Sequence, residues 1–162
     1  MERCEHCGEE HEAKDLFCPK TGKLRAEQLL PPHTMLEEKY LIGKPLGVGG
    51  MGAVFAARHT LLDKKVAVKV MLTSDEQAMA RLVREARAAS ATGHPNITAV
   101  TDMGKTSRGA LFVVMEYLEG QTLEALIKAK PFGPRRALRL TAQVLAGLDV
   151  VHAKGIIHRD LK

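Results

Sequence analysis

The sequence predicts an α+β domain in which a small antiparallel sheet with one helix comes first and helices alone follow. Short apolar, β-branched runs separated by glycine-rich or polar turns fill much of residues 40–72. Apolar residues at helical spacing follow over residues 75–91, before a second pair of strand-like runs. After residue 122 the pattern is helical only.

The sheet is expected to contain five strands bounded by turn residues. The glycine run 47–52 connects the first two strands, the polar run 62–65 precedes the third, and residues 105–109 form a turn between the last two. The expected strands are residues 40–46, 53–58, 66–72, 97–103 and 110–116.

Three helices are expected. Ser74 with Gln77 resembles a capping box that opens the helix 75–91, and Gly93-His94-Pro95 ends it. A short helix covers residues 122–130, and Pro134 suits the first turn of a longer helix to residue 153. The apolar face of that last helix is formed by Leu138, Thr141, Ala142, Leu145 and Leu148.

Composition limits the function classes. The 162 residues are 45% hydrophobic and 27% charged, which is ordinary for a globular chain. No run of about 18 apolar residues is present, so no membrane span is expected within this chain. The charged residues 1–10 do not resemble a secretory signal, and a cytoplasmic location is the default expectation.

The net charge of +5 is distributed unevenly. Residues 1–38 carry 5 basic and 9 acidic side chains, a balance of −4, and the remaining residues carry 19 basic and 10 acidic, a balance of +9. A basic part can indicate a nucleic-acid or membrane partner. Here the basic residues are scattered and aromatic residues make up only 4% of the chain, so no stacking platform for bases is evident and no nucleic-acid partner is expected.

Three segments follow from these patterns. Residues 1–23 contain all three cysteines, residues 24–38 include Pro31-Pro32 and read as a linker, and residues 39–162 form the folded domain.

The cysteine pattern resembles the paired knuckles of a zinc ribbon. Cys4 and Cys7 are spaced to hold one tetrahedral ion, Cys18 begins a second knuckle, and Thr21 stands where a fourth cysteine would be expected. His11 or His6 could complete a three-cysteine, one-histidine set. The alternative is a degenerate ribbon that binds no metal.

Two further features indicate phosphate chemistry. Gly47, Gly49 and Gly52 lie between two strands, which disfavours a dinucleotide-binding turn and fits a hairpin whose amides approach phosphate oxygens. Lys69 follows on the third strand, and Ala67 shares its face because side chains alternate. Glu85 lies beside the apolar stripe of the helix 75–91, where it can face the sheet and pair with Lys69.

The final run His158-Arg159-Asp160-Leu161-Lys162 completes a resemblance to bacterial members of the eukaryotic-type serine/threonine protein kinases. That resemblance covers about residue 39 to the end and implies a kinase N-lobe, an antiparallel sheet plus helix C, with the first helices of the C-lobe. It implies ATP-dependent phosphorylation of protein serine or threonine. Asp160 would be the catalytic base, Lys162 would steady the transferred phosphoryl group, and Lys69 paired with Glu85 would hold the ATP phosphates.

By the same resemblance, ATP contacts a larger set of residues, in which Met115 is the gatekeeper and the backbone of Glu116 and Leu118 binds adenine. The set is Leu46, Gly47, Val48, Gly49, Gly50, Met51, Gly52, Ala53, Val54, Ala67, Lys69, Met115, Glu116 and Leu118.

The family pattern continues with a magnesium-binding asparagine and a DFG segment, and neither is in this sequence. The 162 residues alone are therefore expected to lack kinase activity, to leave the 138–148 face without packing partners, and to fold poorly. The expectation is a fragment of a longer kinase. The alternatives are a non-catalytic module that binds nucleotide or protein, and a zinc-ribbon nucleic-acid binder.

Overall fold

The computed structural model describes residues 2–12, 15–49, 52–72, 80, 83–84 and 93–157. They fall into two compact units. The first comprises Met1–Met79 and Thr101–Tyr117, and the second comprises Ala80–Val100 and Leu118–Lys162.

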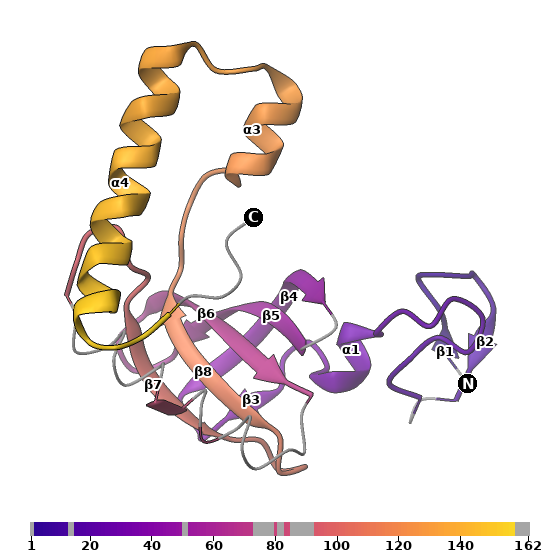
Figure 1. The fold of residues 1–162 in the computed structure, drawn as a ribbon. Coiled ribbons are helices and arrows are strands. Elements are labelled where there is room, and N and C mark those ends of the chain that lie inside the picture. The colour runs from indigo at the N-terminus through magenta and orange to yellow at the C-terminus, as the bar shows by residue number, and fades with distance from the viewer. Residues whose placement is uncertain are drawn as a thin grey trace. The chain divides into compact units, whose positions relative to one another are not determined.

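A six-stranded sheet forms the body of the first unit (Figure 1). Its strand order is β3-β4-β5-β6-β8-β7, and the pairings from β3 to β8 are antiparallel. The strands are β3 (Met35–Leu36), β4 (Tyr40–Gly49), β5 (Gly52–His59), β6 (Lys64–Met71), β7 (Val100–Lys105) and β8 (Leu111–Glu116).

The hydrophobic core lies against one face of this sheet. Alternate residues of β5, β6 and β8 point into it, and Phe55, Val68 and Phe112 are fully buried. Val66 and Val70 flank Val68 on the same face. The intervening residues of the three strands therefore lie on the opposite face.

The segment before the sheet contains three short elements. They are β1 (Glu2–Arg3), β2 (Glu10–His11) and α1 (Ala26–Leu29), and β1 pairs with β2. The residues assigned from sequence to a linker, 24–38, carry α1 and β3. Leu24, Leu29, Leu30 and Leu36 in that stretch are buried in the same core as the sheet, because burial removes their apolar side chains from water.

The second unit contains helices α3 (Leu123–Ala129) and α4 (Pro134–Ala153). The Thr122 hydroxyl caps α3 by accepting from the Ala125 amide at 3.1 Å. Pro134 occupies the first turn of α4, where its missing N–H costs no helical hydrogen bond. Gly147 is buried against Asn96, whose carbonyl oxygen would lie 3.1 Å from an added Cβ.

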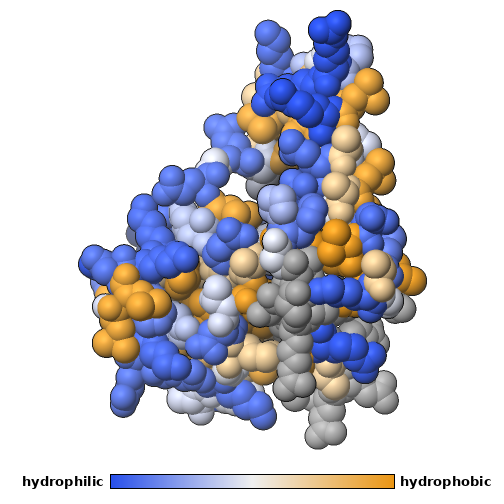
Figure 2. Space-filling model, turned by 90° about the vertical axis from the view of Figure 1, so that its left-hand side faces the viewer, coloured by the Kyte–Doolittle hydropathy of each residue, from blue (hydrophilic) through white to orange (hydrophobic). Residues whose placement is uncertain are grey.

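Much of the apolar face of α4 is open among the described residues. Leu138 is 71% exposed and Leu145 is 58% exposed. Figure 2 shows apolar side chains in orange among hydrophilic ones in blue on the surface. The sequence predicted this helix and its apolar stripe.

The predicted strands and the two C-terminal helices are confirmed, with shifted ends. The first strand runs on through the predicted glycine turn to Gly49. The fourth begins at Val100 rather than at Ile97, because Ile97 and Asn96 close a tight turn onto His94. Most of the predicted helix 75–91 lies outside the described residues. No described helix is both long and apolar enough to cross a membrane.

Candidate nucleotide site and metal centre

The glycine hairpin between β4 and β5 is held in register up to its tip. Gly47 pairs with Val54 and Gly49 pairs with Gly52. At Gly52, φ is +143°, and a Cβ there would overlap the carbonyl oxygen of Val70 on β6. Only glycine suits that position.

The first two glycines of the hairpin have a different environment. A Cβ on Gly47 or Gly49 would meet nothing within 4 Å. The fold itself therefore does not require glycine at these two positions. Small residues there leave the backbone amides open to close approach by an anion.

Lys69 lies in the middle of the sheet face that is turned away from the core. It pairs with Val54 on β5 and with Val113 on β8, so these three side chains form one row. Ala67 forms the next row with Ala56 on β5 and Met115 on β8. The glycine hairpin, Ala67, Lys69 and Met115 are thereby gathered on one face.

The end of β8 carries the residues predicted to bind adenine. Glu116 is the last residue of the strand and pairs with Val66 on β6. Leu118 belongs to the second unit and is 65% exposed. At the hairpin, Leu46 and Val48 are partly exposed and Ala53 is buried. The predicted site residues that lie outside the described residues are Gly50, Met51, Glu85, Asp160 and Lys162.

A second cluster lies in the N-terminal segment. The ligand atoms of Cys4, Cys7, His11 and Cys18 all lie within 4.8 Å of one another. The Cys7 Sγ to His11 Nε2 distance is 3.0 Å, and the Cys18 Sγ to His11 Nε2 distance is 3.7 Å. Ligand atoms around tetrahedral zinc are separated by about 3.5–3.8 Å, given Zn–S and Zn–N bonds of about 2.3 and 2.0–2.1 Å. The cluster thus has close to the dimensions of a zinc site.

Cys4 and Cys18 each begin a tight turn, and the two turns are similar. The Gly8 amide donates to the Cys4 carbonyl at 2.8 Å, and the Gly22 amide donates to the Cys18 carbonyl at 2.8 Å. Both glycines have positive φ, +76° and +67°, which suits glycine at the close of a tight turn. The second turn therefore has the same hydrogen bond as the first, with Thr21 at the place that corresponds to Cys7.

The cysteines are free thiols and two of them are buried. The pKa of Cys18 is lowered to about 5, first by the hydrogen bond from the Thr21 side chain and then, against burial, by the Thr21 and Lys20 amides. At Cys7 a backbone hydrogen bond at Glu9 lowers the pKa, but burial and then the neighbouring thiols of Cys18 and Cys4 outweigh it, so the pKa of Cys7 is raised. A thiolate is the form that binds a metal.

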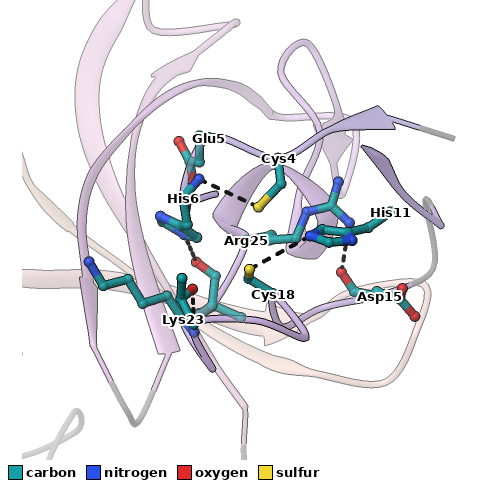
Figure 3. A network of polar contacts seen from close by, with 10 residues as sticks. Cys4, Glu5, His6, His11, Asp15, Cys18, Lys23 and Arg25 are labelled. Carbon is teal, nitrogen blue, oxygen red and sulfur yellow. Dashed lines mark hydrogen bonds and ion pairs between the residues drawn. The ribbon is translucent and has the colours of Figure 1, made fainter. Parts of the chain in front are cut away.

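The structure also distinguishes His11 from His6, the two histidines that the sequence offered as the fourth ligand. Pairing of Glu2 with His11 in the β1–β2 hairpin returns His11 to the first knuckle. His6 instead has its Nε2 2.9 Å from the Leu24 carbonyl (Figure 3).

Arg25 is a residue of this segment that the sequence did not single out. It is 4% exposed, and its Nη1 donates to the carbonyls of Glu12 at 3.0 Å and Asp15 at 3.1 Å. Figure 3 shows its guanidinium beside Asp15. A single arginine within a predicted linker carries no sequence signal for such a role.

Comparison with known families identifies the larger part of the chain. The family described as "Protein kinase domain" matches residues 40–162. The chain belongs to the protein kinase family. The chain is 47% identical over 128 residues to the serine/threonine-protein kinase pkn3 of Myxococcus xanthus, covering 76% of this chain and 23% of that protein. It is 42% identical over 139 residues to the serine/threonine-protein kinase PknB of Mycobacterium leprae, covering 82% and 22%.

A solved kinase structure agrees in fold. The PknI kinase domain of Mycobacterium tuberculosis aligns with a TM-score of 0.71 at 27% identity, over 82% of this chain and 55% of that one. The protein-kinase-like fold, N-lobe sheet and start of the C-lobe, is thereby confirmed. The chain spans about a quarter of the length of the curated kinases that it matches.

Proposed function

We propose that the protein is an ATP-dependent serine/threonine protein kinase that transfers a phosphoryl group to hydroxyls of other proteins. The observation that carries this proposal is the row Val54–Lys69–Val113 next to the glycine hairpin, on the sheet face turned away from the core. Membership of the kinase family and the serine/threonine-protein kinase names of the relatives support the same activity.

In the proposed mechanism the protein contributes mainly position and charge. The glycine hairpin covers the ATP phosphates, and the Lys69 ammonium neutralises part of their charge. Ala67 leaves room for the adenine ring above the sheet. Asp160 accepts the proton of the acceptor hydroxyl, and Lys162 stabilises the transferred phosphoryl group. Glu85 orients Lys69.

Kinases require Mg²⁺, which neutralises charge on the ATP phosphates. In this family the ion would be held by an asparagine of the catalytic loop and by the aspartate of a DFG segment, and none of the residues proposed here is a magnesium ligand.

Variants of Lys69 in the full-length protein test whether this residue binds the ATP phosphates. Lys69→Met is expected to lower phosphoryl transfer by about 10²-fold or more, since a group that stabilises transition-state charge is lost. Lys65→Met, at an exposed position on the same strand, is the matched control and should leave transfer unchanged. Equal activity of wild type and Lys69→Met would overturn the assignment. Nucleotide binding with no transfer in the wild type would favour the non-catalytic module.

We also propose that Cys4, Cys7, His11 and Cys18 bind one Zn²⁺. The four ligand atoms clustered within 4.8 Å and the two matching knuckle turns support this. Metal analysis should find one zinc per chain in the wild type and much less in Cys18→Ser. His6→Asn, the control, should retain the metal because His6 lies on the Leu24 carbonyl. Less than a tenth of an ion per chain in the wild type would favour a degenerate ribbon.

A further inference from the structure

The stretch Leu24–Leu30 belongs both to the cysteine segment and to the kinase sheet. Leu24, Ala26, Leu29 and Leu30 are buried in one continuous core with the sheet residues, and α1 contacts β4. Leu16, which lies between the ligands His11 and Cys18, packs against the same core. The N-terminal segment is thus continuous in packing with the N-lobe.

Backbone hydrogen bonds tie the second knuckle to that stretch. The Cys18 amide donates to the Lys23 carbonyl at 2.8 Å, and the Arg25 amide donates to the Leu16 carbonyl at 2.7 Å. The Leu24 carbonyl is 2.9 Å from His6 Nε2, inside the first knuckle. The first knuckle is therefore linked to Leu24, and the second is linked to Lys23, the residue that precedes Leu24.

The Arg25 side chain adds a link to the chain between the ligands. Its buried guanidinium donates to the carbonyls of Glu12 and Asp15, which lie between His11 and Cys18 (Figure 3). Its chain neighbours Leu24 and Ala26 are both in the core. If the segment between His11 and Cys18 shifted, the buried guanidinium of Arg25 would lose acceptors, and the free energy of the folded state would rise.

The sheet holds the other side of the stretch. Arg108, in the turn between β7 and β8, donates from Nη1 to the Gln28 carbonyl of α1 at 3.1 Å. β3 follows at Met35–Leu36 and pairs with β4. The stretch is fixed at one end by the knuckles and at the other by the sheet.

From these contacts we infer that the metal centre and the kinase N-lobe fold as one thermodynamic unit, so that zinc at Cys4, Cys7, His11 and Cys18 stabilises the ATP-binding sheet through Arg25 and the Leu24–Leu30 stretch. This inference rests on the proposed zinc site and extends it from a local site to control of the kinase lobe. A segment of about 20 residues buries too little apolar surface to fold alone. Metal binding to the folded state alone lowers the unfolded fraction by a factor of 1 + [Zn]/Kd, about 100-fold at 100 times Kd.

Amide hydrogen exchange of the full-length protein, with the zinc content of the same sample measured, tests whether zinc stabilises the sheet. The probes are amides of β5 and β6, which are in the core and remote in sequence from the cysteines. Removing zinc with a chelator should speed their exchange by about 10- to 100-fold, and added zinc should restore it. Arg25→Met should keep one zinc per chain but lose most of this zinc-dependent protection. Arg58→Met, at an exposed arginine of the β5–β6 hairpin, is the control and should behave as wild type.

Three results would contradict the inference or part of it, and they differ in what else they affect. One zinc per chain with β5 and β6 exchange independent of the metal would refute the coupling and leave the zinc site intact. No zinc binding would refute both. Zinc-dependent protection in Arg25→Met equal to that of the wild type would refute the role given to Arg25. None of these readouts uses phosphoryl transfer, so the proposed kinase activity is tested separately.

Discussion

Gly52→Ala should weaken the N-lobe more than Gly47→Ala or Gly49→Ala, the substitutions at the other two described glycines of the nucleotide hairpin. The backbone at Gly52 has φ of +143°, and an added Cβ would overlap the carbonyl oxygen of Val70 and lie 3.0 Å from its carbonyl carbon. Such a backbone conformation costs about 1–3 kcal/mol for a residue other than glycine. Overpacking against rigid backbone adds about 1–3 kcal/mol.

The sum, about 2–6 kcal/mol, is large beside a typical domain stability of about 5–15 kcal/mol. It corresponds to a fall in melting temperature of roughly 10 °C or more for a lobe of this size. Relief of the overlap requires β5 to move away from β6 at the pair Ala53 and Val70. The loss should therefore appear in the sheet itself, as faster amide exchange in both strands.

Gly49→Ala is the matched control in the same hairpin. Its φ is outside the left-handed region and nothing lies within 4 Å of the added Cβ, so its stability should stay within about 0.5–1 kcal/mol of wild type. Its nucleotide affinity should fall, because the methyl group occupies space next to the hairpin amides. Thermal unfolding followed by circular dichroism compares the two. Melting temperatures within about 2 °C of wild type for Gly52→Ala would refute this reasoning.

Three further predictions concern polar contacts. Tyr40→Phe removes the hydroxyl that donates to Asp102 at 2.7 Å from a buried ring, and urea unfolding should show a loss of about 1–2 kcal/mol; an unchanged midpoint would contradict this. Burial raises the pKa of Asp102, but hydrogen bonds from Tyr40 and the Met103 amide and the charge of Lys39 outweigh it, so the pKa is lowered. The carboxylate therefore stabilises the fold above its unfolded-state pKa of about 3.9, and this contribution is lost as the pH falls below that value. The urea midpoint should therefore fall less steeply between pH 6 and pH 3 in Asp102→Asn than in the wild type. Thr122→Ala removes the cap of α3 and should lower the stability of that helix by about 1 kcal/mol, seen as faster exchange of its first amides, whereas unchanged exchange would show the cap to be unimportant.

The sheet was predictable because its signals are local. Alternation placed Ala67 and Lys69 on one face, and the glycine run marked a hairpin. The end of β4 and the start of β7 were harder to predict than the strands themselves. Pairing of Gly49 with Gly52 across the hairpin extends the strand. The turn at His94 moves the first residue of β7 to a later position in the sequence.

The N-terminal segment was harder to predict because its contacts are distant in sequence. Proline and polar residues suggested a linker, whereas Leu24 and Leu30 are buried by strands that come later in the chain. Sequence spacing could not separate His6 from His11. The hairpin register that brings His11 to the cysteines was needed for that. The predicted roles of Glu85 and Asp160 concern residues outside the described part of the chain and stay predictions.

The most direct test of the central claim is phosphoryl transfer from labelled ATP by the protein as encoded, with the acceptor residue identified by phosphoamino-acid analysis. We expect phosphoserine or phosphothreonine with the wild type. Asp160→Asn should lose transfer and retain nucleotide affinity, because the base is removed while the hairpin and Lys69 remain. Transfer that survives unchanged in Asp160→Asn, or a wild-type protein that binds ATP and transfers nothing, would show that the proposed kinase activity is wrong.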